Sequence, residues 1–233
     1  RRVARSESSD FVNWSEPTVV IDAQCWEEQP YAMTVFPHGD AYLGFLVIHD
    51  QISDRAWTEL AYSDDTLTWQ RIDAGNALIG CSDTELDYDY GCVYACAGPV
   101  FLDEEVRLYY GGSDWLHFGW RNGCLALATL RADGFAGYSQ VKQDQPGVLR
   151  TNLMDYGGEE IQLTADVMPQ GSIVVKLLDH KDQVIAENSV NGSTTDGVVL
   201  PASSLAITPE MSRVRLEFTV VSAQLFSFVL VGQ

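Results

Sequence analysis

The apolar residues of this chain fall in short runs, which alternate with polar residues over 161–167 and 214–220, and helical spacing is nearly absent. The clearest apolar runs are short and end in polar turns; they cover residues 31–36, 41–47, 93–101, 106–110 and 161–167. Aromatic and β-branched residues fill these runs, which is typical of strands. The pattern therefore predicts an all-β protein.

A short motif recurs three times before residue 143. In each copy a small residue and a hydroxyl residue precede an acidic turn and then an aromatic residue, which is Trp14, Trp69 or Phe135. An Asp side chain in such a turn caps backbone amides, and the aromatic ring can close over the edge of a sheet. We therefore expect these three aromatic residues to be structural.

A hairpin also recurs, at an offset of 65 residues that aligns Val35 with Val100 and Leu43 with Leu108. The offset predicts that the two hairpins superpose in register. Two hairpins in a unit of about 60 residues are typical of four-stranded propeller blades. Residues 1–143 then supply about two and a half blades, fewer than a closed ring needs. We predict a partial β-propeller with open edges, through which a homodimer could form.

The pattern changes after residue 143. Evenly spaced short strands predict a separate C-terminal β-sandwich over residues 144–233. A turn is expected at Gly171-Ser172, and residues 191–210 are expected to form a loop with one short strand at 198–200. The other predicted strands of this part cover 161–167, 173–178, 184–190, 214–220 and 223–231.

Composition narrows the choice of partners. The net charge of −19 over 233 residues argues against nucleic acid and against an anionic membrane surface. Such a charge suits a neutral or cationic ligand, and it also keeps a protein soluble. Without an apolar run long enough for a spanning helix, no membrane association is expected. The sequence opens with Arg1-Arg2 rather than Met, so we expect the natural N-terminus to be missing; a secreted and a cytoplasmic location both stay open.

The cysteines and histidines predict neither a metal site nor a cofactor. The five cysteines are odd in number and lack metal-type spacing. Cys92 and Cys96 would share one face of a strand at a separation too large for a disulfide. The histidines are scattered along the chain, at His38, His49, His117 and His180.

Several short motifs lie within the predicted strands and turns. They are 25–30 (Cys-Trp-Glu-Glu-Gln-Pro), 98–100 (Gly-Pro-Val), 108–112 (Leu-Tyr-Tyr-Gly-Gly), 127–135 and 225–228 (Leu-Phe-Ser-Phe). With these motifs the chain resembles the five-bladed propeller glycosidases of glycoside hydrolase families 32 and 43, which include invertases, levanases and arabinanases. The tail is similar to the sandwich appended to the family 32 propeller. The similarity covers nearly the whole chain but only the C-terminal half of a full family member.

The resemblance implies carbohydrate as the ligand and carboxylates at the propeller axis as the catalytic groups. Glu27, after Trp26, matches the general acid of the family. Because this chain has one residue more before Pro30, Glu28 is the alternative. The family's motifs for the other two carboxylates are absent. Since glycoside hydrolysis ordinarily requires two carboxylates astride the scissile bond, we expect this chain alone to be inactive.

Further residues are candidates for sugar binding. Trp26 and Trp115 offer aromatic rings, and Asp114 and His117 lie near Trp115 after a Gly-Gly turn. Asp89 ends an acidic stretch over 83–89 that lacks the spacing of a calcium loop. For each of these residues the alternative is an ordinary position in a surface loop, without a role in binding. Two hypotheses therefore stand: a portion of a glycosidase, or a non-catalytic module that binds carbohydrate or is purely structural.

Overall fold

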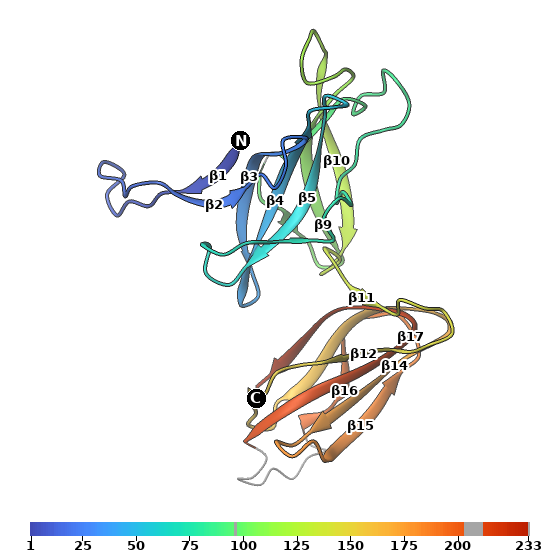
Figure 1. Ribbon diagram of the computed structural model, residues 1–233. Helices are drawn as coiled ribbons and strands as arrows, with labels where there is room; N and C mark the ends of the chain where they lie inside the picture. Colours follow the sequence, from blue (N-terminus) through green and yellow to red (C-terminus); the bar gives the residue numbers. More distant parts are fainter. Residues whose placement is uncertain (96, 203–211, 233) are drawn as a thin grey trace. The chain divides into compact units, whose positions relative to one another are not determined.

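The computed structural model describes residues 1–233 except residues 96, 203–211 and 233. In this part of the chain every regular element is a β-strand, so the predicted all-β class is confirmed. The chain divides into two compact units, Arg1–Leu130 and Arg131–Gln233 (Figure 1). Among the described residues there is no helix of the length and hydropathy that a membrane crossing requires.

The first unit contains one complete four-stranded blade. Each strand pairs in antiparallel fashion with the next strand of the chain. Successive antiparallel strands that pair in chain order are the topology of a propeller blade. The four strands are β3 (Glu28–His38), β4 (Ala41–Asp50), β5 (Arg55–Ser63) and β6 (Gln70–Ile72).

A second blade and half of a third flank the complete one. In the second blade β9 lies between β7 and β10, and β8 also pairs with β9. A parallel pair between Ala56 and Cys92 joins the two blades. The partial propeller is confirmed, because the described strands form about two and a half blades without closing into a ring. These strands are β1 (Arg2–Arg5), β2 (Thr18–Asp22), β7 (Cys92–Ala95), β8 (Val100–Phe101), β9 (Glu105–Ser113) and β10 (Gly123–Arg131).

Strand β4 is buried on both of its faces. Leu46 and Ile48 pack on one side in a cluster that includes Ile21 of the β1–β2 hairpin. Val47 points to the opposite side and packs with Cys92 of the second blade. A strand covered on both faces reads as a continuous apolar run, which explains the unbroken apolar sequence of residues 43–48.

The recurring acidic turn has one geometry in two of its three copies. Asp10 accepts hydrogen bonds from the backbone amides of residues 12 and 13, and Asp65 accepts them from the amides of residues 67 and 68. These bonds lower the pKa of both carboxyls. The residue after each Asp has a left-handed φ, 60° at Phe11 and 63° at Thr66. In the third copy Asp133 itself has the left-handed φ, so the turn differs there.

The three aromatic residues of this motif have different surroundings. The ring of Trp69 lies over Gly44, where an added Cβ would sit 3.0 Å from Cζ3. Phe135 is buried as expected, but Trp14 is 54% exposed. Trp14 contacts Phe11 edge to face, with ring centroids 5.5 Å apart. The predicted covering of a sheet therefore applies to Trp69 and not to Trp14.

The predicted equivalence of the two hairpins is wrong in register. In the first hairpin Phe36 pairs with Leu43, whereas in the second Phe101 pairs with Val106. Both hairpins close on two-residue turns, at 39–40 and 103–104, which are 64 rather than 65 positions apart. When a hairpin turn shifts by one residue, the partner of each strand residue shifts by two. An offset of 65 therefore aligns residues that do not have equivalent cross-strand partners.

The second unit is a β-sandwich built around two long strands, β14 (Glu160–Leu178) and β17 (Arg213–Val231). The first half of β14 pairs with β16 and with the second half of β17, and the second half of β14 pairs with β15 and with the first half of β17. Side chains from both halves meet in one core. The shorter strands, all paired to these two, are β11 (Tyr138–Ser139), β12 (Gly147–Arg150), β13 (Met154–Asp155), β15 (Val184–Val190) and β16 (Thr194–Leu200).

The long strands correct the predicted strand boundaries of the tail. The turn expected at Gly171-Ser172 is a corner inside β14, where the register with β17 shifts between Val167 and Ser172. An added Cβ at Gly171 would lie 2.3 Å from the backbone oxygen of Ser222, so glycine permits the close approach. Predicted strands 161–167 and 173–178 are therefore one strand, as are 214–220 and 223–231. The strand expected at 198–200 begins earlier, at Thr194.

Candidate functional site

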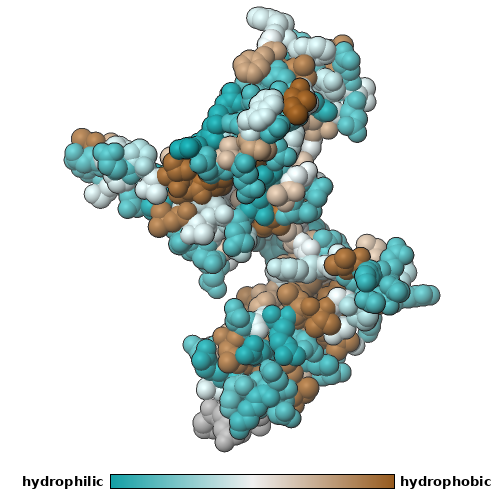
Figure 2. Space-filling view, in the orientation of Figure 1, coloured by the Kyte–Doolittle hydropathy of each residue, from teal (hydrophilic) through white to brown (hydrophobic). Residues whose placement is uncertain are grey.

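A cavity of about 390 Å³ lies in the first unit beside the complete blade. It is bounded by the β2–β3 connection, by β3 and β4, and by residues 69–74. Apolar surface gathers where the β1–β2 hairpin meets the blade (Figure 2). Polar lining groups include Asp22, Gln24, Glu28, Gln70 and Arg71, with Trp69 as the aromatic member. Aromatic and hydrogen-bonding groups in one concave site are the usual composition of small-molecule sites.

Arg71 is the central charged group of this cavity. Its Nε and Nη2 donate to the two carboxylate oxygens of Glu59 at 2.8 Å each. Its two Nη atoms also lie 3.2 Å from Oε2 of Glu28. Hydrogen bonds and charge attraction from Glu59 raise the pKa of Arg71. The guanidinium therefore bridges a buried carboxylate and a cavity-lining one.

The two glutamates of the arginine pair have different exposure. The side chain of Glu59 is completely buried, and Trp57 Nε1 and the amide of Gly75 also donate to it. The side chain of Glu28 is 40% exposed. Both carboxylate oxygens of Glu59 thus accept hydrogen bonds inside the blade, whereas Glu28 is accessible to a ligand from the cavity.

The structure separates the two candidate acids, Glu27 and Glu28. Glu28 begins β3 and lines the cavity. The backbone oxygen of Glu27 accepts a bond from the amide of Gln51, which continues the β3–β4 ladder by one residue. Successive residues of a strand face opposite sides, so Glu27 points away from the face of Glu28. Trp26 is 65% exposed and is outside the cavity lining.

Asp89 lies apart from this cavity, in the second blade. Its Oδ2 accepts a hydrogen bond of 2.9 Å from the hydroxyl of Tyr110 on β9, and both residues are buried. Burial, followed by hydrogen bonds with Tyr88 and Asp89, raises the pKa of Tyr110. Asp89 is therefore held by a buried hydrogen bond within the second blade. Its predicted role in sugar binding stays a prediction.

Asp114 and Trp115 border a shallow surface depression together with Trp120. Asp114 accepts bonds from the backbone and side-chain amides of Asn122, at 2.8 and 2.6 Å, which lower its pKa. These bonds close the loop between β9 and β10. Trp120 is the most exposed residue of the three, at 91%. The depression involves no residue of the Glu28 cavity.

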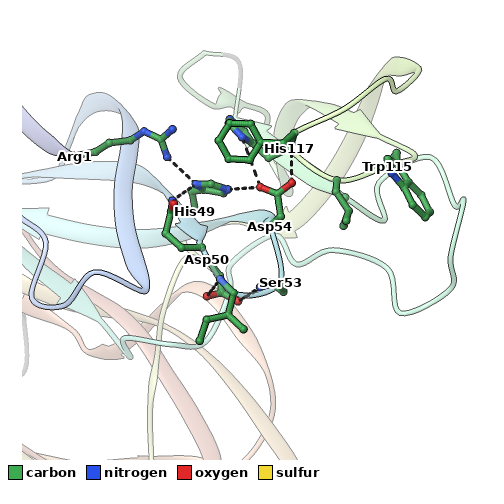
Figure 3. A network of polar contacts seen from close by, with 12 residues as sticks. Arg1, His49, Asp50, Ser53, Asp54, Trp115 and His117 are labelled. Atoms are coloured by element: carbon green, nitrogen blue, oxygen red, sulfur yellow. Dashed lines mark hydrogen bonds and ion pairs between the residues drawn. The ribbon is translucent and has the colours of Figure 1, made fainter.

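His117 belongs to a third location, where it meets two residues that sequence reasoning missed (Figure 3). His49 is the penultimate residue of β4, Asp54 lies in the β4–β5 turn, and His117 lies in the loop between β9 and β10. Nε2 of His49 is 3.0 Å and Nδ1 of His117 is 3.8 Å from Oδ1 of Asp54. Trp115 stands apart from these three (Figure 3). The one signal for His49 was an ionisable residue directly after the apolar run 43–48.

The hydrogen bonds fix the proton position on His49. Its Nδ1 lies 2.7 Å from Nη1 of Arg1 and 2.6 Å from Nε2 of Gln51. Since a guanidinium can only donate, Nδ1 is the acceptor and Nε2 donates to Asp54. Burial, followed by the charge of nearby His49, lowers the pKa of His117. Neutral imidazole is the form that binds metal ions, and the lowered pKa of His117 favours that form.

The predicted site residues therefore lie in separate places within the first unit. Among the cavities found in the described residues, none brings Glu28, Asp89 and His117 together. The roles of Glu27, Glu28 and the other candidates stay predictions. Sequence reasoning missed Arg71 and Glu59, because a charged pair inside a strand gives no local pattern.

Comparisons with known proteins give matches in solved structures. Neither a family model nor a curated protein matches the chain. The GH32 β-fructofuranosidase BmSUC1 of Bombyx mori matches with 14% identity and a TM-score of 0.37, and a mutant of it in complex with sucrose matches with 11% identity and a TM-score of 0.37. The match covers 100% of this chain and 61% of each of these. A structure described as a glycoside hydrolase has 10% identity and a TM-score of 0.34, with 95% of this chain and 64% of that chain covered.

Proposed function

We propose that this chain is part of a glycoside hydrolase-like protein and binds carbohydrate in the cavity lined by Glu28, Trp69 and Arg71, without hydrolysing it alone. The observation that carries the proposal is the ion pair between Glu28 and Arg71 at the wall of that cavity, beside an aromatic side chain. A carboxylate and a guanidinium together offer acceptors and donors to sugar hydroxyls. The resemblance of motif 25–30 to the glycosidases supports the same ligand class.

The environment of Glu28 favours binding over acid catalysis. A general acid must hold a proton until the leaving group takes it. Glu28 instead contacts a guanidinium at 3.2 Å through a single oxygen, and such a pair uses the charged carboxylate. The second oxygen of Glu28 is left to accept a bond from a sugar hydroxyl. The proposal therefore keeps Glu28 as a binding group and assigns hydrolysis, in a complete protein, to carboxylates on other sequence.

A calorimetric titration tests the proposal with a matched pair of variants. Fructo- and arabino-oligosaccharides are titrated into the intact chain, into E28Q and into E27Q. We expect measurable binding that falls at least tenfold in E28Q and stays unchanged in E27Q, because only Glu28 lines the cavity. Loss of binding in E27Q alone would place the sugar on the other face of β3.

Turnover separates the proposal from its alternative. Incubation of the intact chain with chromogenic furanosides should release no chromophore above the buffer blank. Release that disappears in E28Q would show a complete active site and overturn the non-catalytic proposal. A folded chain that neither binds nor cleaves any of these sugars would favour a purely structural module.

The open edge of the propeller supports a second proposal, a homodimer. The two blades form one sheet in the order β10-β9-β7-β5-β4-β3, which β10 ends. Its outward residues Leu125 and Leu127 are 72% and 47% exposed. Exposed apolar strands at a sheet edge favour association. Sedimentation equilibrium should give a dimer mass that L125K lowers to the monomer mass. A monomer at all concentrations would contradict this proposal.

A further inference from the structure

Three side chains of types that bind metal ions converge in the first unit, although they come from separate segments. One ligand atom from each of His49, Asp54 and His117 lies within 4.8 Å of the other two. We propose that these residues form a binding site for a divalent zinc-type ion, with water in the fourth position. Two imidazoles and one carboxylate are a donor set that Zn²⁺ accepts. Ca²⁺ is disfavoured, because it takes six to eight oxygen ligands.

An unpartnered atom points into this site. Nδ1 of His117 is buried and has no hydrogen-bond partner, and the side chain is only 9% exposed. At 3.8 Å from Oδ1 of Asp54 it is too distant for a hydrogen bond. A buried polar atom without a partner costs about 1–3 kcal/mol. A bound ion between His117 and Asp54 supplies the missing partner.

The separations of the ligand atoms suit a tetrahedral ion. Zn–N distances of about 2.0–2.1 Å place neighbouring ligands about 3.3 Å apart. The two separations from Oδ1 of Asp54, 3.0 and 3.8 Å, lie on either side of this value. The two histidine ligand atoms lie within 4.8 Å of each other, so rotations of the His117 and Asp54 side chains would have to close the longer separations around an ion.

The other bonds of Asp54 leave its ligand atom, Oδ1, to the two histidines. Oδ2 of Asp54 accepts the amide of Phe118 at 2.7 Å, and the backbone oxygen of Asp54 accepts the amide of His117 at 2.8 Å. These two bonds hold the loop between β9 and β10 against the β4–β5 turn. Oδ1 remains directed at the two histidines (Figure 3). Such outer contacts orient metal ligands in proteins.

Aromatic rings contact both histidines. The ring centroid of Tyr31 is 5.1 Å from that of His117, and Phe118 is 4.7 Å from His117 and 5.9 Å from His49. His49 itself is completely buried. A partly apolar shell limits competition from water at the ligand atoms. The ion would connect the β9–β10 loop of the second blade to the complete blade and so stabilise their contact.

Arg1 competes with the ion. To bind through Nε2, His49 must carry its proton on Nδ1, where Arg1 now donates from 2.7 Å. Gln51 can accept that proton by turning its amide, since amide orientation follows the hydrogen-bond network. Arg1 can only donate, so it must leave Nδ1. Removing the guanidinium should therefore tighten metal binding.

Cobalt(II) and zinc titrations of the chelator-treated intact chain test the site. We expect one Co²⁺ per chain, with visible bands of a tetrahedral or five-coordinate ion that added Zn²⁺ abolishes. H117Q and D54N should each weaken binding at least tenfold, and R1Q should strengthen it severalfold. H180A, which removes an exposed histidine of the second unit, should bind like the unmodified chain.

Three outcomes overturn the proposal. The first is a chain with a native circular dichroism spectrum that binds no Co²⁺ or Zn²⁺. The second is unchanged metal affinity in both H117Q and D54N. Two variants are used so that the test still gives a result if one of them does not fold. The third is a thiolate-to-cobalt charge-transfer band, which would place the ion on cysteines. The sugar titrations are read separately, because no residue of this site lines the Glu28 cavity.

Discussion

Arg71 binds both carboxylate oxygens of Glu59 at 2.8 Å, and the Glu59 side chain is completely buried. The pair joins β5 to β6 through their side chains as well as through the strand ladder. Glu28 contacts the same guanidinium from the cavity side. One arginine thus has a structural partner and a ligand-facing partner.

Replacing Arg71 by alanine should destabilise the chain by about 3–5 kcal/mol, because it leaves the Glu59 carboxylate buried without its partner. E28Q should change stability by about 1 kcal/mol or less, because this carboxylate is substantially exposed. Urea unfolding followed by circular dichroism measures both. Equal losses in the two variants would contradict the division between a structural and a ligand-facing glutamate.

Alanine at Gly171 should destabilise the sandwich by about 1–3 kcal/mol, because the added methyl group meets the backbone of the opposite strand. Gly192 provides the control, since an added Cβ there has nothing within 4 Å. Thermal unfolding of G171A and G192A checks the difference. A G171A variant as stable as the unmodified chain would show that β14 and β17 do not approach closely at the corner.

Cys81 should be alkylated more slowly than Cys25. Burial raises its pKa to about 11, and only the thiolate is alkylated. Iodoacetamide labelling, read by peptide mass spectrometry, should therefore modify exposed Cys25 first near about pH 8. Labelling at Cys81 should rise about tenfold per pH unit below its pKa. Equal rates at both cysteines would be inconsistent with the buried position of Cys81.

Glu217 should contribute to the acid sensitivity of the sandwich. Hydrogen bonding from Arg150 lowers its pKa below the ordinary value of 4.5. A lowered folded-state pKa adds stability above the ordinary value, and that stability is lost as the pH falls through the folded-state pKa. The melting temperature of E217Q should therefore fall less than that of the unmodified chain between neutral pH and about pH 3. Parallel curves for the two proteins would contradict the ion pair.

Local patterns were sufficient to predict the strands and the acidic turns. The apolar runs 31–36 and 41–47 and the Asp10 and Asp65 turns depend on neighbours in sequence, and the structure confirms them. Pairing register and the two long strands of the sandwich were not predictable in this way. A corner such as Gly171 looks like a turn in sequence, because both place glycine between apolar runs. The domain boundary at residue 143 stays a prediction.

The candidate sites were less predictable than the fold, because they depend on contacts between distant segments. Glu28 and His117 were identified as candidates from local motifs. Their partners Arg71 and Asp54 lie 43 and 63 positions away in the chain, and no local pattern marks them. Topology alone brings such residues together. This is also why the histidines, scattered in the sequence, predicted no metal site.

The most direct test of the proposed carbohydrate site is a nuclear magnetic resonance titration of the isotope-labelled chain with a fructo- or arabino-oligosaccharide. The account predicts saturable shifts of the Trp69 indole N–H and of backbone amides in residues 20–24 and 69–74, which border the cavity. Shifts confined to the depression of Trp115 and Trp120, or the absence of any saturable shift in the folded chain, would contradict it.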